Sequence, residues 1–282
     1  MDIIKKVKGI LGPVVDFIVV NKITWRIMTF LLRGSEWVRF RRSQYEHKVA
    51  EKKLKLFYTD RIVKSGFFYG MKYCSFNSSG SSIFPKLLGS YEVELYSTFL
   101  KLQRHKYKYI LDVGCAEGYY AVGLALRFPD AKIYGFDINK EALSRCKELA
   151  QFNNVEDRVL LSETCTSSTL ESFAFSGRSL IICDCEGYEK ELFTRANIYR
   201  LKATDLVIEL HPFAVKDVRK YLAGLFSTTH DISFISSMDN NRKIFDFNFL
   251  LNGLNQLEQL KSVEEGRPFT MEWLIAESKC NV

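Results

Sequence analysis

Residues 110–125 read ILDVGCAEGYYAVGLA, and this stretch decides the fold. A short apolar run ends in Asp112, small residues follow at Gly114, Ala116 and Gly118, and the next segment is apolar again. The pattern predicts a strand, a tight turn and a packed helix, because glycine tolerates backbone conformations that other residues avoid. Free N–H groups at the start of such a helix favour a polar or negatively charged ligand. We therefore expect the turn to bind a ligand.

A second strand-and-helix unit follows the glycine turn. Residues 131–138 (AKIYGFDI) predict a strand that ends in Asp137, 23 residues after Gly114. An acid at this position is placed to accept hydrogen bonds from ribose hydroxyls. The alternative is that Asp137 is a helix N-cap or a turn acid ahead of the helix predicted over residues 139–152.

The spacing of the turn separates two classes of cofactor that both contain a ribose. Dinucleotide sites use G-x-G-x-x-G, whereas the spacing here is G-x-A-x-G. Glu117 lies within the turn, where its charge would repel a pyrophosphate but suits a positively charged sulfonium that carries an amino group. The segment DVGCAEGYY resembles the class I S-adenosylmethionine-dependent methyltransferases, in which D-x-G-x-x-x-G closes the first strand.

That resemblance implies S-adenosylmethionine as cofactor and a set of cofactor contacts. Glu163 and Thr164 are assigned by position only, since they follow the third predicted strand, where methyltransferases often contact the adenine. The complete predicted set is Asp112, Gly114, Cys115, Ala116, Glu117, Gly118, Asp137, Ile138, Glu163, Thr164 and Asp184.

Five further strands are predicted along the chain, and those at residues 180–183 and 206–210 are expected to be buried. The five cover residues 158–162, 180–183, 206–210, 231–236 and 271–277. With the first two strands they make seven, with helices between the early ones. This alternation predicts an α/β fold: a seven-stranded, mostly parallel, doubly wound Rossmann-like sheet with an N-terminal helical and loop extension. The sites of such a sheet lie at the carboxyl ends of its strands.

Polar residues follow two strands that are expected to be neighbours. Asp184-Cys185-Glu186-Gly187-Tyr188-Glu189 follows one strand, and Glu209-Leu210-His211-Pro212 ends the next. The pair IICDCEGYEKELF and VIELHPF resembles the FkbM family of methyltransferases, which carry D-x-E-G-x-E after the fourth strand. The segment LLGSYEVEL and the terminal MEWLIAE are also similar to that family, and the resemblance covers roughly residues 85–277.

The FkbM resemblance implies O-methylation of hydroxyls on sugars, glycans or glycosylated products of polysaccharide biosynthesis. A neutral hydroxyl is a poor nucleophile, and His211 is the best candidate for its base because an ordinary histidine titrates near neutral pH. Asp184 and Glu186 are rival bases or orient the acceptor. Alternatively, Asp184, Glu209 and His211 hold a divalent metal. Each of these residues also has a plain structural alternative, as a helix cap or a core side chain.

Two other functions remain open. A nucleic-acid methyltransferase would suit the basic half of the chain, but the N/D-P-P-Y/F turn of base N-methyltransferases is absent where DCEG stands. Nucleic acid is therefore an unlikely partner, although a ribose acceptor is retained. A catalytically silent assembly subunit is the non-enzyme alternative, against which the intact motifs argue.

Composition limits the remaining possibilities. The chain has 282 residues and 47% hydrophobic content, enough for one α/β domain with an extension. We place the extension at residues 1–84, with its aromatic, glycine-rich part as a candidate lid, and the methyltransferase domain at 85–282. Seven scattered cysteines without a C-x-x-C pair argue against a zinc module and suggest a reducing compartment. A cytoplasmic location is expected, and the oligomeric state is left open.

Charge is spread unevenly along the chain. Residues 1–109 carry 21 Lys or Arg and 8 Asp or Glu, a net +13, whereas residues 110–282 carry a net −6. Within residues 1–42, neither apolar run reaches the ~18 uninterrupted residues of a spanning helix, and no signal peptide is predicted. Val14, Ile18, Trp25, Met28 and Leu32 fall on one helical stripe, ahead of several arginines. The segment is either an interfacial helix on an anionic membrane, with the protein peripheral there, or a helix packed on the domain or a partner subunit.

Overall fold

The computed structural model describes Val14, Ile18, residues 21–267 and residues 269–280. The chain divides into two compact units after Lys53. Helix α2 (Lys22–Phe57) supplies most of the described part of the first unit, and the second unit contains the sheet. Residues 54–84, which we assigned to the N-terminal extension, belong to this second unit. No helix within the described ranges is long and apolar enough to span a membrane.

The second unit is built on one seven-stranded sheet with the order β3-β2-β1-β4-β5-β7-β6. Strand β7 is antiparallel to both of its neighbours, and the other pairs are parallel. The predicted α/β fold and its seven strands are therefore confirmed. The strands are β1 (Tyr109–Val113), β2 (Lys132–Phe136), β3 (Val159–Ser162), β4 (Ser179–Cys183), β5 (Thr204–Leu210), β6 (His230–Ser236) and β7 (Glu272–Ser278).

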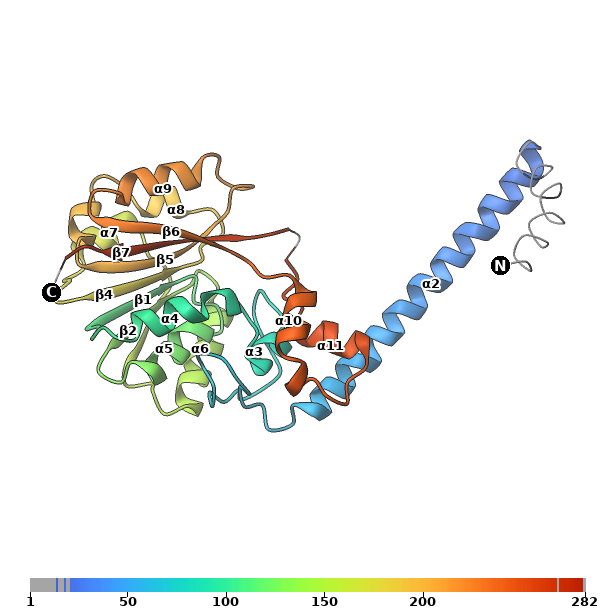
Figure 1. Ribbon diagram of the computed structural model, residues 1–282, viewed down its shortest axis with the longest axis horizontal. Coiled ribbons are helices and arrows are strands. Elements are labelled where there is room, and N and C mark those ends of the chain that lie inside the picture. The colour runs from blue at the N-terminus through green and yellow to red at the C-terminus, as the bar shows by residue number, and fades with distance from the viewer. Residues whose placement is uncertain (1–13, 15–17, 19–20, 268, 281–282) are drawn as a thin grey trace. The chain divides into compact units, whose positions relative to one another are not determined.

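Helices cover both faces of the sheet (Figure 1). One face packs against α4 (Tyr96–Leu102), α5 (Tyr119–Arg127) and α6 (Lys140–Phe152), and the other against α7 (Ser167–Ser172), α8 (Glu189–Leu192) and α9 (Val218–Phe226). Every residue of β4 and β5 is buried. This agrees with their continuous apolar sequence, because central parallel strands are covered on both faces.

The segment between α2 and α4 is part of the core. It holds α3 (Ile83–Leu88) and the 3₁₀ turn η1 (Val93–Leu95), and its aromatic side chains pack on α5. A Cβ added at Gly123 of α5 would lie 2.6 Å from the ring of Phe68. Glycine at this position therefore lets the aromatic segment lie directly on the helix that follows the glycine turn.

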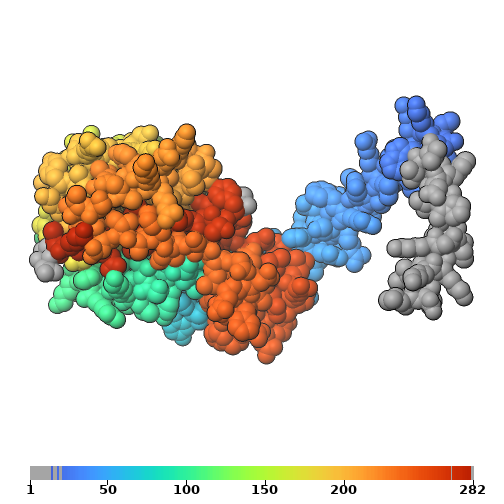
Figure 2. All heavy atoms as spheres, turned by 45° about the horizontal axis from the view of Figure 1, so that its top comes forward, coloured from blue at the N-terminus to red at the C-terminus, as the bar shows by residue number. Residues whose placement is uncertain are grey.

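Short helices connect the later strands. The 3₁₀ turn η2 (Ile198–Leu201) precedes β5, while α10 (Asn240–Asp246), η3 (Asn248–Leu250) and α11 (Gln256–Val263) lie between β6 and β7. Figure 2 shows the α10–α11 segment in orange, bulging from the surface of the second unit. Helix α11 packs against α3, so this late insertion supports the segment that leads to the glycine turn.

Candidate active site

The glycine turn forms as predicted and lies against the end of β4. Gly114 has φ +88° and Gly118, the N-cap of α5, has φ +97°. A Cβ at Gly114 would lie 1.7 Å from the carbonyl oxygen of Asp184, closer than any side chain can approach. The backbone N–H of Asp184 also donates to the carbonyl of Val113, at 2.8 Å. The absence of a side chain at Gly114 therefore brings the two predicted motifs together.

Asp137 ties the end of β2 to the glycine turn. One oxygen of its carboxylate accepts a hydrogen bond from the N–H of Ala116, and the other accepts one from Asn139, both at 2.8 Å. Asn139, and not Asp137, is the N-cap of α6. The helix-cap alternative is therefore wrong for Asp137, whereas the turn-acid alternative agrees with its hydrogen bond from Asn139. Its half-buried carboxylate keeps lone pairs for a ribose, since each oxygen has more than one acceptor position.

We expect Asp137→Ala to weaken S-adenosylmethionine binding by about 10- to 100-fold, because each charge-assisted hydrogen bond contributes roughly 1.5–3 kcal/mol. Isothermal titration calorimetry measures this effect. Asp137→Asn is the matched variant, since it keeps one carbonyl oxygen and should lose less affinity. Equal affinity of the wild type and the alanine variant would remove Asp137 from the cofactor site.

The other predicted cofactor residues on this side lie at the carboxyl ends of β2 and β3. Ile138 is 83% exposed, and Glu163 and Thr164 are also exposed. Glu163 pairs with Lys140 across 3.0 Å between two exposed side chains. The N–H of Asp137 donates to the carbonyl of Ser162 at 3.2 Å, so both strand ends meet beside the ribose acid. Their contacts with a cofactor stay a prediction.

Glu117 has partners within the protein that the sequence did not suggest. Its buried carboxylate pairs with Lys86 and accepts hydrogen bonds from the hydroxyl of Ser78 and the N–H of Ser79, both at 2.9 Å. Burial alone would raise the pKa of Glu117, but the Lys86 ammonium lowers it. The carboxylate is therefore charged, and its contacts with Ser78, Ser79 and Lys86 hold the segment between α2 and α4 against the glycine turn.

Two buried carboxylate oxygens near the turn have no hydrogen-bond partner among the described residues, and they suit a cationic ligand. They are Oδ2 of Asp112 and Oδ1 of Asp184. Burial raises the pKa of Asp112 to about 8. A sulfonium or ammonium group beside these oxygens would stabilise their charged forms by Coulomb attraction. The chemistry of this end of the site therefore fits S-adenosylmethionine, which carries both groups.

His211 and Glu189 form the central pair of the second motif. His211 directly follows β5, and Glu189 is the first residue of α8. The Nδ1 atom of His211 lies 2.6 Å from Oε1 of Glu189, and both side chains are buried. A carboxylate at Nδ1 fixes the orientation of the ring and leaves Nε2 as the atom that faces the site.

Three further carboxylates surround Nε2 of His211. Asp184 lies at 3.4 Å, Glu186 at 3.6 Å and Glu209 at 3.8 Å. The predicted rim of acids and histidine is thus brought together, with Glu186 the most exposed member. Among the described residues, Asp184, Glu186 and His211 each offer one ligand atom, and these atoms lie within 4.8 Å of one another. Glu186 rather than Glu209 completes this three-residue set.

Burial and neighbouring charges set the protonation of this cluster. Burial raises the pKa of Glu209, and the nearby Asp184 raises it further, so Glu209 holds a proton and bonds to Asp184. Burial would lower the pKa of His211, but the hydrogen bond to Glu189 and the charges of Asp184 and Glu186 raise it above its ordinary value. His211 is therefore a stronger base than a free histidine.

Glu189 is the main functional residue that the sequence reasoning missed. It is the last letter of D-x-E-G-x-E, so the signal was present in the quoted motif. A second missed group is a buried network around Arg267, whose guanidinium contacts Glu265 at 2.8 Å, Glu92 at 2.9 Å and Glu209 at 3.7 Å. No pattern in the sequence indicated that network, because its members come from segments more than 50 residues apart.

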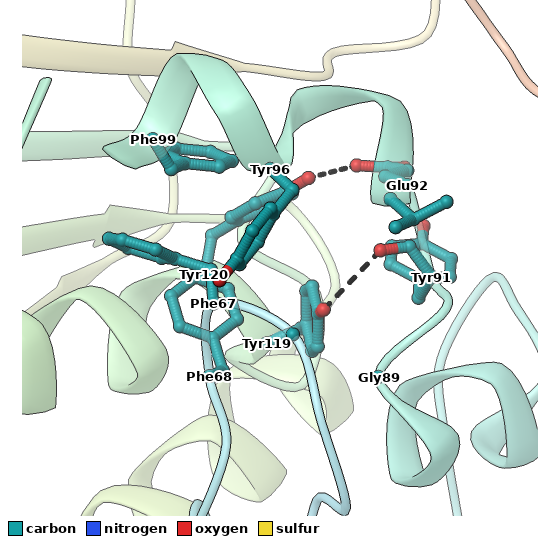
Figure 3. Close-up of a pocket in the computed structure, with 11 residues that line it drawn as sticks. Phe67, Phe68, Gly89, Tyr91, Glu92, Tyr96, Phe99, Tyr119 and Tyr120 are labelled. Atoms are coloured by element: carbon teal, nitrogen blue, oxygen red, sulfur yellow. Dashed lines mark hydrogen bonds between the residues drawn. The ribbon is translucent and has the colours of Figure 1, made fainter. Parts of the chain in front are cut away.

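A small aromatic pocket lies beside the turn, on the side of the aromatic segment (Figure 3). The hydroxyl of Tyr120 donates to Glu92, and the hydroxyl of Tyr119 donates to the carbonyl of Tyr91 at 3.5 Å. These two tyrosines open α5, so their hydrogen bonds hold the start of that helix against the preceding segment. The pocket is lined by Gly66, Phe67, Phe68, Gly89, Tyr91, Glu92, Val93, Tyr96, Phe99, Tyr119 and Tyr120.

Part of the chain is similar to known methyltransferases. Residues 104–223 match the family model described as a methyltransferase domain. The chain is similar to the solved precorrin-6y C5,15-methyltransferase of Geobacter metallireducens GS-15, with 14% identity, a TM-score of 0.45, and coverage of 67% of this chain and 88% of that chain. It is also similar to an rRNA methylase of Streptococcus thermophilus, with 13% identity, a TM-score of 0.43, and coverage of 66% and 97%. No curated protein sequence matches.

The family match begins before β1 and ends within α9, so it includes the glycine turn, Asp137 and both motifs of the rim. Residues 104–223 are therefore a methyltransferase domain, which implies S-adenosylmethionine as its cofactor.

Proposed function

We propose that this enzyme transfers a methyl group to a hydroxyl of a sugar or glycan, and that it is of the FkbM type. The observation that carries the proposal is the buried His211–Glu189 pair beside the glycine turn, which is a general base with a fixed orientation. Its position at the end of D-x-E-G-x-E supports the FkbM assignment. Methyl transfer to a hydroxyl needs such a base, because the oxygen loses its proton as it forms the new bond.

When bound, S-adenosylmethionine supplies an electrophilic methyl group. The protein residues then do two things in this proposal. Nε2 of His211 accepts the hydroxyl proton, and the resulting imidazolium is stabilised by Glu189 at Nδ1. Asp184 and Glu186, which lie 3.4 and 3.6 Å from Nε2, accept hydrogen bonds from the acceptor and hold its reacting oxygen near the base.

Exposed aromatic rings beside His211 favour a sugar as the acceptor. The ring of Phe213 lies 5.6 Å from that of His211, and Phe269 packs edge-on against Phe213 at 5.3 Å. Both phenylalanines are exposed, at 60% and 45%. Aromatic faces next to hydroxyl-binding carboxylates match the apolar and polar sides of a sugar ring.

A divalent metal is the second role for the same residues. Asp184, Glu186 and His211 offer a compact set of ligand atoms. Both roles need an unprotonated Nε2, so the raised pKa of His211 does not separate the base from the metal ligand, and the experiment must do so. Turnover that persists after EDTA treatment supports the base, whereas turnover that is lost and then restored by Mg²⁺ or Mn²⁺ supports the metal.

The rate of methyl transfer should rise with pH. His211 must be unprotonated to accept a proton, and its pKa is raised above the ordinary value near 6.5. The rate at saturating cofactor should therefore be low below about pH 6.5 and increase through the raised pKa of His211. A pH–rate profile of the wild type measures this, and a flat profile between pH 6 and 9 would contradict the assignment of His211 as base.

The acceptor class is tested by measuring S-adenosylhomocysteine formation with a panel of acceptors. The panel contains nucleotide sugars, short glycans, nucleosides and a structured RNA. Turnover with a sugar or glycan alone supports the proposal. Turnover with RNA or nucleosides alone supports the ribose alternative, and cofactor binding without turnover on any acceptor favours the silent-subunit alternative.

A further inference from the structure

The described part of the first unit is a long helix that carries large apolar side chains in contact with solvent. Helix α2 has 36 residues, which span about 50 Å at 1.5 Å per residue. Apolar side chains in its first half are 57–76% exposed: Ile23, Ile27, Phe30, Leu31, Trp37 and Val38. Exposed apolar patches of this kind mark an interaction surface more often than single exposed residues do.

These six side chains form one stripe along the helix, which we call the apolar stripe of α2. At about 100° per residue, their positions fall within about 120° of one another. Trp25, Met28 and Leu32, which we predicted to form the stripe, lie on the opposite side by the same geometry. Trp25 and Leu32 are themselves 46% and 49% exposed, so the helix carries exposed apolar side chains on this side as well.

Basic side chains border the apolar stripe. Residues 22–42 contain six Lys or Arg and one acid, Glu36. By the helical geometry, Arg26 and Arg33 lie just beside one edge of the stripe and Arg42 beside the other. The hydroxyl of Ser35, near one edge of the stripe, donates to the helix backbone at 2.7 Å, which removes much of the cost of taking it out of water.

We propose that α2 binds the surface of an anionic lipid membrane and lies in its interface, with the apolar stripe among the acyl chains. A wide apolar face that includes Trp37, with flanking arginines, is the pattern of an interfacial helix. The excess of positive charge on residues 22–42 favours an anionic lipid surface over a neutral membrane. It also favours that surface over an uncharged groove on a protein partner. The proposal concerns the first unit and does not depend on the acceptor proposed above.

The distribution of tryptophan makes a direct test available. The chain has three tryptophans. Trp25 and Trp37 of α2 are 46% and 64% exposed, whereas Trp273 of β7 is fully buried. Changes in emission on adding vesicles therefore report on α2.

The experiment uses the full-length chain with vesicles of phosphatidylcholine alone or with about 30 mol% phosphatidylglycerol. We expect co-sedimentation with the anionic vesicles only, weaker at high salt, with a blue shift of tryptophan emission and quenching by brominated lipid. The triple variant Phe30→Ser, Leu31→Ser, Trp37→Ser should lower the partition coefficient by at least about tenfold. Each of Arg26→Gln and Arg33→Gln should lower it by about fivefold.

Matched variants in the second unit test whether losing exposed aromatic or basic side chains anywhere on the protein weakens vesicle binding. Phe245→Ser with Phe249→Ser removes two exposed rings, and Arg104→Gln with Lys147→Gln removes two exposed charges. Both pairs should bind vesicles like the wild type. Three results would overturn the proposal: a wild type that stays in the supernatant, triple-variant binding equal to wild type, or a dimer that the triple variant dissociates without any vesicle binding.

Discussion

Replacing His211 by alanine is expected to lower turnover by about 10² to 10⁴-fold, the usual contribution of a positioned general base. The affinity for S-adenosylmethionine should stay near that of the wild type, because His211 is not among the residues predicted to contact the cofactor. Glu189→Gln should also lower turnover, since an amide cannot stabilise the imidazolium that forms at His211. Calorimetry for binding and S-adenosylhomocysteine release for turnover separate the two effects.

The matched control for this pair is His105→Ala. His105 precedes β1, at the opposite end of the strands from the rim, and its ring contacts Tyr107 only at the edge. This variant should retain wild-type turnover. If His211→Ala also retains turnover while binding is intact, then His211 is a structural histidine and the base is elsewhere in the rim.

Local sequence patterns predicted the fold and the outline of the site because each depends on contiguous residues. Each strand was predicted from its local sequence, and the motif residues lie at or just after the ends of β1, β2, β4 and β5. Parallel strands place their carboxyl ends at one edge of the sheet. The proximity of Asp184 to Gly114 and to His211 therefore followed from the order of strands, which the structure confirms.

Features that depend on distant packing were not visible in the sequence. The charge of Glu117 was read as a cofactor contact, yet its nearest cation is Lys86, which lies 31 residues earlier on α3. Glu189 had no predicted role beyond its place in the motif, and only the fold of α8 against β5 turns its carboxylate towards His211. Helix α2 continues unbroken through the charged stretch after residue 42 to Phe57. No local pattern encodes such long-range pairs.

The close approach at Gly114 underlies the second large prediction. Gly114 and Gly70 have nearly equal backbone angles, with φ of +88° and +89°. A Cβ at Gly70 would meet nothing within 4 Å, whereas a Cβ at Gly114 would lie 1.7 Å from the carbonyl oxygen of Asp184. A comparison of the two positions separates the cost of the backbone conformation from the cost of the clash. Gly118 should have an intermediate cost of substitution, because a Cβ there would lie 2.6 Å from Sγ of Cys146, a side-chain atom and not a backbone one.

Gly114→Ala should therefore be the most damaging of three alanine substitutions. Gly70→Ala should lower the free energy of unfolding by about 1–2 kcal/mol, the cost of a left-handed conformation for a residue with a Cβ. Gly114→Ala should cost about 1–3 kcal/mol more, because it forces the backbone of β1 and β4 apart. The same shift moves Asp184 away from Nε2 of His211, so turnover should fall more steeply than stability. Urea unfolding followed by tryptophan emission measures stability, and turnover is measured under native conditions. We expect both losses to increase in the order Gly70→Ala, Gly118→Ala, Gly114→Ala. If Gly114→Ala lowers neither the free energy of unfolding nor the turnover more than Gly70→Ala does, then the close contact between Gly114 and Asp184 does not hold the two motifs together.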